Sequence, residues 1–395
     1  MKKTVCIIGG GPSALVLAAF LDPKKFSATI YEKNKTVGRK FLVAGKGGFN
    51  LTHGESMQKL IQRYTPSGFL DEALQNFSNE DFRNWLAQIG IPTYVGSSNR
   101  VYPTKGIKPI TVLKAILVHL NQKGVEFKYE HEFTGWDSKN NPIIQQKSVT
   151  CDYTVFSLGG ASWKITGSDG NWLNTFAQNN IKTRPFQASN CGYQIAWTSD
   201  FIEKHEGTPL KNMAISCGNS LQKGEAVITK FGLEGNAIYG LSPQIRQELH
   251  QNEKALIFAD FKPTMTKEKI IAKLHSSKQK NNTAKLKKDL KVVNAQIDLL
   301  KSQLSKETYM NLEALAGKLK RLPLEIVKAA TLDEAISSVG GIDISSVSSH
   351  LEIQQKPNQF CIGEMLDWDA PTGGYLLQAC ASLGVHVAEH LNTRH

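Results

Sequence analysis

Three small residues and one carboxylate near the start of the chain have the spacing of a dinucleotide-binding motif. The motif reads Gly9-x-Gly11-x-x-Ala14, and Glu32 follows it at about 20 residues, the usual distance. Gly9 permits a tight turn, Gly11 lets a pyrophosphate approach the backbone, and Ala14 keeps a helix close to the preceding strand. The carboxylate of Glu32 can accept hydrogen bonds from the ribose of an adenosine. These residue types therefore predict a dinucleotide site.

A strand, a helix and a second strand must hold these residues in place. Residues 4–8 are typical of a strand, residues 13–21 predict a helix of small residues, and residues 28–31 predict a second strand. Together they form a βαβ unit of about 30 residues. Backbone N–H groups at the start of the helix, from Ser13 onward, lie at the positive end of the helix dipole and would face the phosphates. The alternative is a glycine-rich turn in an α/β sheet that binds no ligand.

The other end of the chain carries a second glycine-rich segment. Residues 358–365 predict a strand that ends at Gly363 and Glu364, and a helix follows. In many FAD enzymes a returning strand and a last helix meet the flavin, and N–H groups at the helix start stabilise the charge of the reduced ring. Gly373 and Gly374 would leave room for that ring. This segment favours FAD over NAD; the alternative is that the paired glycines only form a turn.

Five segments, taken in order, resemble a known family. They are VGRKFLVAGKGGFNLTH (37–53), SLGGASWKITGSDG (157–170), PFQASNCGYQIAW (185–197), GLEGNAIYGLS (232–242) and GEMLDWDAPTGGYLLQA (363–379). They resemble the bacterial FAD flavoproteins known as BaiN-like or aminoacetone-oxidase-like NAD(P)/FAD-dependent oxidoreductases, over nearly the whole chain. The wider family usually has Gly-Arg-Lys, then Ser-Gly, then Arg-Cys-Asn, whereas residues 44–50 here read AGKGGFN. That departure matches a subgroup of unknown substrate.

The resemblance implies a cofactor site in two halves. The adenosine and pyrophosphate half would contact Gly9, Gly11, Pro12, Ser13, Ala14, Glu32, Lys33, Arg39, Lys40, Phe133, Gly159 and Gly160. The ribityl chain and flavin ring would contact Gly47, Gly48, Phe49, Asn50, Leu51, Gly363, Glu364, Thr372, Gly373, Gly374 and Tyr375. The alternatives are an exposed basic loop for Arg39 and Lys40, and ordinary core packing for Phe49, Trp163 and Tyr375.

No pattern in the sequence identifies a catalytic residue or a metal site. The unperturbed pKa of His53 would suit a general base, but no sequence partner fixes that role, and we interpret it as a capping or surface histidine. The six cysteines form no C-x-x-C pair, which predicts buried reduced thiols and argues against disulfide-reductase chemistry. No cluster has metal-ligand spacing. No second Gly-x-Gly-x-x-Gly follows a strand, so NAD(P)H is predicted at most as a transiently docked electron donor.

The predicted fold class is α/β, with a discontinuous Rossmann-like FAD-binding domain formed by residues 1–190 and 335–395. Residues 191–263 contain short β-type runs separated by glycines, which predict an inserted barrel-like β region. Residues 264–334 form a lysine-rich helical region. Apolar residues in it recur at intervals of three and four, which predicts an amphipathic helix in an antiparallel pair: Leu286, Leu290, Val293, Ile297, Leu300 and Leu304.

The charge of the chain is unevenly distributed. The net charge is +12, and residues 264–330 hold 15 Lys and Arg against 6 Asp and Glu. Because aromatic residues are almost absent there, no stacking platform is predicted, and nucleic acid is an unlikely partner. No apolar run approaches the roughly 20 residues that span a bilayer, and no signal peptide is recognisable. A cytoplasmic location is predicted.

These observations predict an FAD-dependent oxidoreductase that transfers a hydride between flavin N5 and a small-molecule substrate, with the inserted region as a lid. The alternative is an FAD-binding sensor, scaffold or RNA-associated protein without redox turnover. The sequence leaves open the substrate, the electron donor or acceptor, the catalytic acid or base, the oligomeric state and the role of the lysine-rich region.

Overall fold

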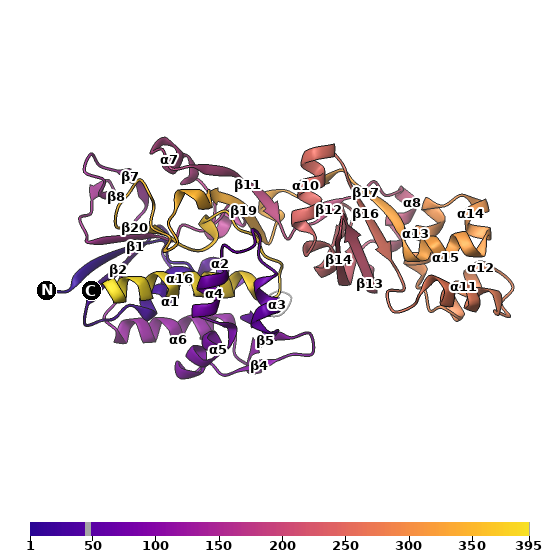
Figure 1. The fold of residues 1–395 in the computed structure, drawn as a ribbon, viewed down its shortest axis with the longest axis horizontal. Coiled ribbons are helices and arrows are strands. Elements are labelled where there is room, and N and C mark those ends of the chain that lie inside the picture. Colours follow the sequence, from indigo (N-terminus) through magenta and orange to yellow (C-terminus); the bar gives the residue numbers. More distant parts are fainter. Residues whose placement is uncertain (44–48, 395) are drawn as a thin grey trace. The chain divides into compact units, whose positions relative to one another are not determined.

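The computed structural model describes residues 1–43 and 49–394. The chain divides into two compact units (Figure 1), of which unit 1 comprises Met1–Ala188 and Ile336–His395 and unit 2 comprises Ser189–Ala335. The two ends of the chain therefore fold together in unit 1, and the middle of the chain forms unit 2.

A five-stranded parallel sheet lies at the centre of unit 1. Its order is β20-β10-β1-β2-β6, and its strands are β1 (Lys3–Ile8), β2 (Phe26–Glu32), β6 (Glu126–Tyr129), β10 (Tyr153–Phe156) and β20 (Gln359–Cys361). Parallel register pairs Ile8 of β1 with Tyr31 of β2 and with Phe156 of β10. The carboxyl ends of these strands therefore lie at one edge of the sheet. The prediction of an α/β fold with a Rossmann-like parallel sheet is confirmed.

Three helices pack beside this sheet. They are α1 (Pro12–Phe20), α6 (Pro109–Gln122) and α16 (Tyr375–Arg394), and α1 contacts both of the others. A Cβ at Gly384 of α16 would lie 2.6 Å from the carbonyl oxygen of Ser13, so the two helices approach closely. Burial on both sides explains why α1 consists almost entirely of small and apolar residues. The last helix begins at Tyr375, three residues after the predicted start.

Further strands and helices complete unit 1. An antiparallel sheet of order β3-β5-β4 and another of order β7-β8-β9 flank the parallel sheet, and β11 pairs with β19. The strands are β3 (Thr52–His53), β4 (Thr93–Val95), β5 (Arg100–Pro103), β7 (Phe133–Trp136), β8 (Pro142–Ile144), β9 (Lys147–Ser148), β11 (Thr183–Ser189) and β19 (Ser337–Ile342). The helices are α2 (Arg39–Val43), α3 (Met57–Ile61), α4 (Asp71–Asn76), α5 (Asn79–Gln88) and α7 (Leu173–Gln178), with 3₁₀ turns η1 (Lys164–Thr166), η3 (Ile344–Ser346) and η4 (Gly363–Met365).

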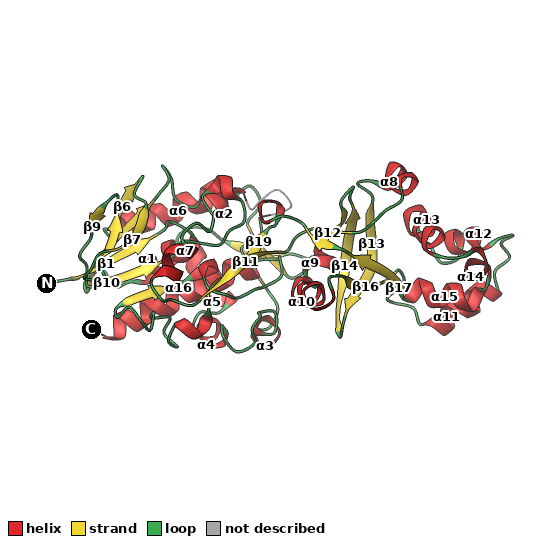
Figure 2. Ribbon diagram, turned by 90° about the horizontal axis from the view of Figure 1, so that it is seen from above, coloured by secondary structure: helices red, strands yellow, loops and turns green. Residues whose placement is uncertain are grey.

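Unit 2 is built on one antiparallel sheet of order β17-β16-β13-β14-β15-β12-β18. Its strands are β12 (Tyr193–Gln194), β13 (Pro209–Cys217), β14 (Ser220–Ile228), β15 (Gly232–Glu234), β16 (Ala255–Asp260), β17 (Leu322–Ile326) and β18 (Lys328–Ala329). Helices α11 (Lys267–His275), α12 (Asn282–Lys288), α13 (Asn294–Gln303), α14 (Lys306–Met310) and α15 (Leu312–Lys320) lie together beyond the β17 edge (Figure 2). The remaining helical elements are α8 (Ser199–His205), α9 (Asn236–Tyr239), α10 (Ser242–Asn252) and η2 (Leu332–Glu334).

The prediction of one amphipathic helix through residues 286–304 is wrong. The helix breaks after Lys288 and restarts at Asn294 as α13. Lys291 takes a positive φ of 52°, and Val293 is a helix cap that stays 48% exposed. The 3–4 spacing arose because buried apolar residues of α12, of the loop after it and of α13 follow one another in the sequence: Leu286, Leu290, Ile297 and Leu300. Strands β17 and β18 also lie within the stretch that was predicted to be helical. In the part of the chain that the structure describes, no helix combines the length and apolarity needed to cross a membrane.

Candidate functional site

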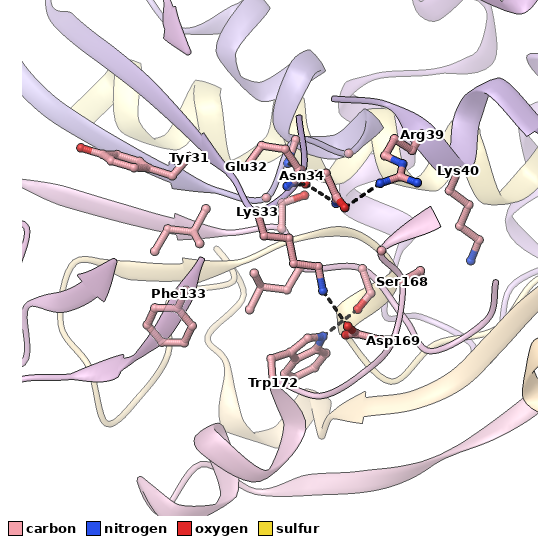
Figure 3. Close-up of a pocket in the computed structure, with 18 of the residues that line it drawn as sticks. Tyr31, Glu32, Lys33, Asn34, Arg39, Lys40, Phe133, Ser168, Asp169 and Trp172 are labelled. Atoms are coloured by element: carbon pink, nitrogen blue, oxygen red, sulfur yellow. Dashed lines mark hydrogen bonds and ion pairs between the residues drawn. The ribbon is translucent and has the colours of Figure 1, made fainter. Parts of the chain in front are cut away.

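A cavity of about 400 Å³ lies at the carboxyl ends of the parallel strands of unit 1. Ligands of open α/β sheets bind at this edge, where the strands lead into the loops before the helices. The end of β1 forms one part of its wall. Figure 3 shows that other parts come from the end of β2, from the start of β7 and from the loop before α7. The predicted site residues that line it are Gly9, Gly11, Pro12, Ser13, Glu32, Lys33, Arg39, Lys40, Phe133, Gly159 and Glu364.

Gly9 and Gly11 are glycines for different reasons. Gly9 has a φ of 99°, and a Cβ there would lie 2.2 Å from the carbonyl oxygen of Ser157, so the turn itself requires glycine. Gly11 caps α1 with an ordinary φ of −79° and no side-chain cap, and a Cβ there would meet no atom within 4 Å. The first turn of α1 therefore presents unpaired N–H groups and the positive end of its dipole to open space, which suits an anion.

Glu32 is held in a fixed orientation at the end of β2. Its Oε2 accepts a hydrogen bond from the Gly10 N–H at 2.8 Å. Its Oε1 accepts bonds from the backbone N–H of Asn34 at 2.8 Å and from the Asn34 side chain at 2.6 Å. The residue is only 8% exposed. The carboxylate therefore shapes the glycine loop as well as the cavity, and a change at Glu32 would disturb both.

The opposite wall was not predicted as part of the site. Lys33 forms an ion pair with Asp169 at 2.8 Å, and the Trp172 indole donates to the Gly159 carbonyl at 3.1 Å. The hydroxyl oxygen of Ser168 is buried and has no hydrogen-bond partner among the described residues, although it lines the cavity. An unsatisfied buried hydroxyl at a cavity wall fits a polar ligand. The only sequence signal for Ser168 and Asp169 was their place in the segment 157–170 of the family resemblance, and Trp172 lies just after that segment.

Arg39 and Lys40 do not form an exposed basic loop. Arg39 donates to Asn34 Oδ1 at 2.7 Å and to the carbonyl oxygen of Ile165 at 2.8 Å. The Lys40 ammonium lies 2.8 Å from Glu364 Oε2 and 2.7 Å from the Ser162 hydroxyl. Both cations are half-buried, and they join segments from both ends of the chain around the cavity.

The other predicted site residues lie outside the cavity wall. Ala14, Gly160 and Gly363 pack behind it, since they are buried but do not line it. Phe49, Asn50 and Leu51 precede β3, and Thr372, Gly373, Gly374 and Tyr375 lie at the start of α16. Phe49 packs edge-on against Phe41 at 5.0 Å between ring centroids. Gly47 and Gly48 lie outside the described residues.

A buried polar network surrounds the start of α16. The Tyr375 hydroxyl donates to Glu55 Oε1 at 2.6 Å, and Arg63 binds both oxygens of Glu55 at 3.0 Å. Burial alone would raise the pKa of Glu55, but the hydrogen bonds from Arg63 and Tyr375 hold it below its ordinary value. Glu55 is therefore an ionised carboxylate. Neither Glu55 nor Arg63 was predicted, because no local motif marks them.

His53 belongs to this network; it is not a surface residue, and its ring nitrogen has the other predicted role, that of capping a backbone N–H. It is 9% exposed, and its ring stacks on that of Tyr375 at 4.8 Å between centroids. Its Nδ1 accepts a hydrogen bond from the Glu55 N–H at 3.3 Å. Burial lowers the pKa of His53, and the charge of Glu55 offsets part of this shift. The His53 ring therefore packs against Tyr375 and binds the backbone of Glu55.

The two glycines before α16, Gly373 and Gly374, differ in the atoms that surround them. A Cβ at Gly374, where φ is 101°, would lie 2.5 Å from the backbone of Thr52 in β3. The crossing of two backbone segments therefore by itself requires glycine at position 374, and the expectation that Gly374 leaves room for a ring stays a prediction. A Cβ at Gly373 would meet only the ring of Tyr375 at 3.4 Å and Nε of Arg100 at 3.6 Å, which are ordinary contact distances.

Changing Glu55 to Gln should lower the free energy of unfolding by about 3 kcal/mol at pH 7, since the Arg63 pair is partly buried. The folded-state pKa of Glu55 lies below its unfolded value, so its contribution is complete above about pH 4.3. The contribution disappears as the pH falls through the lowered pKa, and the two proteins should then converge. Urea denaturation at pH 7 and at pH 3 measures the difference. Equal stability at pH 7 would contradict the prediction.

Comparisons with known proteins find a family model and distant relatives over nearly the whole chain. The family model described as HI0933-like protein Rossmann domain matches residues 3–390. The ribosomal RNA dihydrouridine synthase of Haemophilus influenzae is 25% identical over 390 residues, covering 94% of each chain. The 3-dehydro-bile acid delta(4,6)-reductase of Clostridium scindens is 23% identical over 412 residues, covering 94% of this chain and 95% of the relative. A solved 3-ketosteroid-delta4-(5alpha)-dehydrogenase from Rhodococcus jostii aligns at a TM-score of 0.48 and 12% identity, covering 98% and 96% of the two chains.

Proposed function

Since the chain belongs to the family described as HI0933-like protein Rossmann domain, we propose that it is an FAD-dependent oxidoreductase that reduces a carbon–carbon double bond conjugated to a carbonyl group. The observation that carries this proposal is the uncapped start of α1 at Gly11, which faces a cavity at the carboxyl ends of the parallel strands. That arrangement suits a pyrophosphate, because the helix end is positive and no side chain fills the space before it.

The residues around the cavity fit FAD. Glu32 would bind the adenosine ribose, and the backbone at Phe133 would meet the adenine, since the Phe133 ring itself packs 5.0 Å from that of Phe156. Cys380 of α16 lines the cavity, and Tyr375 lies five residues, or about 7 Å, nearer the helix start. We assign the flavin ring to the neighbourhood of Gly373 and Tyr375. FAD supplies hydride transfer at its N5 atom when bound.

The five-stranded parallel sheet of unit 1 carries the glycine motif. Unit 2 has an antiparallel sheet, which is not the architecture of a dinucleotide-binding domain. We therefore propose that NAD(P)H, if it is the electron donor, docks transiently at the flavin and has no Rossmann domain of its own.

The names of the two relatives support the substrate class. A dihydrouridine is a uridine with a saturated C5–C6 bond, and that bond in uridine is conjugated to the C4 carbonyl. The 4,6 double bonds of a 3-dehydro-bile acid are likewise conjugated to its 3-oxo group. The two substrates differ greatly in size, but the reacting group is the same. We therefore propose that this chain also reduces a carbon–carbon double bond conjugated to a carbonyl group. A small conjugated carbonyl compound is the first candidate substrate.

A uracil base in RNA is the second candidate, and the lysines of unit 2 favour it. Ten lysines on or between α11 and α14 are exposed, and their ammonium groups form no ion pair among the described residues: Lys267, Lys269, Lys273, Lys278, Lys280, Lys287, Lys288, Lys291, Lys301 and Lys306. Two of the nearby carboxylates are engaged by histidines, as in the pairs His275–Glu313 and His205–Asp298. Uncompensated lysines can contact phosphates without reading sequence. RNA binding that weakens steeply between 50 and 200 mM salt, as is usual for such contacts, would favour this candidate over the small molecule.

The purified protein should be yellow and should release FAD, rather than FMN or NAD, when it is denatured. The reason is the ribose carboxylate Glu32 beside the glycine loop, which calls for an adenosine. Chromatography of the released cofactor measures this. Colourless protein that also fails to take up added FAD would contradict the proposal. Anaerobic reduction of the bound flavin by NADH or NADPH, followed by oxidation with 2-cyclohexenone, then separates an enzyme from an FAD-binding sensor or scaffold.

A further inference from the structure

Arg100, the first residue of β5, is a cation without an anionic partner. It is half-buried, and among the described residues its guanidinium makes no hydrogen bond or ion pair. The other arginines of unit 1 are all engaged: Arg39 with Asn34, Arg63 with Glu55, Arg83 with Glu80, Arg184 with Asp343 and Asp367, and Arg394 with Glu352. Arg100 therefore differs from every other arginine in its unit.

The strand pairing fixes where Arg100 lies. Arg100 is directly opposite His53 in the antiparallel pair of β3 and β5, and its Nε would lie 3.6 Å from a Cβ placed on Gly373. Burial lowers the pKa of His53, and the charge of Arg100 lowers it further. The guanidinium is thus held beside the segment that leads into α16.

The surroundings of Arg100 do not neutralise it. Glu55, two residues after His53, is already bound by Arg63 and by the Tyr375 hydroxyl. Its negative charge is therefore paired with Arg63 and not with Arg100. The start of α16 is the positive end of a 20-residue helix, and a cation there is unfavourable in the absence of an anion. Local arrangements that cost stability without an evident structural gain are expected at functional sites.

We propose that Arg100 binds the carbonyl oxygen of the substrate and stabilises the negative charge that this oxygen gains during hydride addition. This inference rests on the proposed function. The planar guanidinium offers paired N–H donors, which suit a carbonyl or an anionic oxygen. Preorganised donors aimed at developing charge are among the largest contributions to catalysis.

The step balances as follows in atoms and electrons. A hydride from the reduced cofactor forms a C–H bond at the β-carbon, and the electron pair of the double bond moves toward the α-carbon and the carbonyl oxygen. A proton from water then forms the second C–H bond at the α-carbon, and the oxygen becomes a neutral carbonyl oxygen again. The substrate gains two electrons and the cofactor loses them. Arg100 does not supply the proton, because its pKa is far above neutrality.

The test compares Arg100→Gln with Arg100→Lys and with a matched control, Arg83→Gln, whose arginine is paired with Glu80 on α5. For the FAD-loaded chain, kcat/KM with 2-cyclohexenone should fall about 100-fold or more in Arg100→Gln, mainly through kcat. It should recover partly in Arg100→Lys and stay unchanged in Arg83→Gln. FAD content should be equal in all four proteins.

A second readout does not depend on turnover. Sulfate should raise the melting temperature of the FAD-free parent and of Arg83→Gln more than that of Arg100→Gln, because an anion stabilises the state that binds it. If Arg100→Gln retains kcat/KM within about threefold of the parent, the proposal is overturned. If no enone is turned over and sulfate stabilises all variants equally, it is also overturned. Sulfate stabilisation that depends on Arg100, without enone turnover, would support the oxyanion site and refute the proposed reaction.

Discussion

Replacing Gly11 with valine should leave the fold of unit 1 intact and remove FAD from the purified protein. Gly11 has backbone angles of φ −79° and ψ 175°, which a β-branched residue adopts readily. A Cβ there meets no atom within 4 Å, so the apo chain has space for the side chain. Valine is a poorer helix cap than glycine, and the cost should be about 1 kcal/mol.

The effect on the cofactor should be much larger. The valine methyl groups would occupy the space in which we place the pyrophosphate, next to the first N–H groups of α1. Loss of the helix-end interaction costs up to about 2 kcal/mol, and each lost hydrogen bond to a charged group costs about 1.5–3 kcal/mol. Together these losses correspond to a decrease in FAD affinity of about 100-fold or more.

Titration of FAD-free protein with FAD, followed by cofactor fluorescence, measures the affinity, and circular dichroism on heating checks the fold. Gly9→Ala is the matched control, because its Cβ would lie 2.2 Å from a backbone oxygen at a φ of 99°. That variant should lose stability with or without FAD. A Gly11→Val protein that melts like the parent and binds FAD as tightly would show that the pyrophosphate does not lie at this helix start.

Replacing Gly374 with alanine should destabilise the FAD-free chain far more than replacing Gly373. Both residues have positive φ, 101° and 121°, which costs an alanine about 1–2 kcal/mol. Only at Gly374 would the Cβ also press against backbone, at 2.5 Å from Thr52. Backbone cannot move aside as a side chain can, and overpacking adds about 1–3 kcal/mol. We expect a loss of about 3 kcal/mol or more at Gly374 and about 1–2 kcal/mol at Gly373.

Urea denaturation of the two FAD-free variants measures this difference. The FAD-free state is the relevant one, because the crossing of Thr52 and Gly374 exists without the cofactor. Equal losses in the two variants would show that β3 yields to the added methyl group. A Gly373→Ala protein that is stable but binds FAD poorly would support a cofactor contact at Gly373, where a methyl group meets only Tyr375 and Arg100 at ordinary distances.

The elements that the sequence predicted well are those whose signals are local. The βαβ unit was predicted to within one or two residues of β1, α1 and β2, because the strand pattern, the glycine turn and the small-residue helix follow one another directly. The predicted helix through residues 286–304 was wrong because its signal was also local. Periodicity reports only which residues are buried, and two short helices in succession can show the periodicity of one long helix. The break at Lys291 depends on packing within unit 2.

The amino-acid sequence by itself determined the Rossmann class of the protein, because the residues of the dinucleotide-binding motif occupy one continuous segment from Gly9 to Glu32. Only the tertiary structure decided which other residues complete the site. The wall formed by Ser168, Asp169 and Trp172 is joined to the rest of the cavity by the ion pair of Asp169 with Lys33. Arg100 lies beside the start of α16 because its strand pairs with that of His53. These contacts join segments more than 40 residues apart along the chain, and no spacing rule in the sequence can encode such distances.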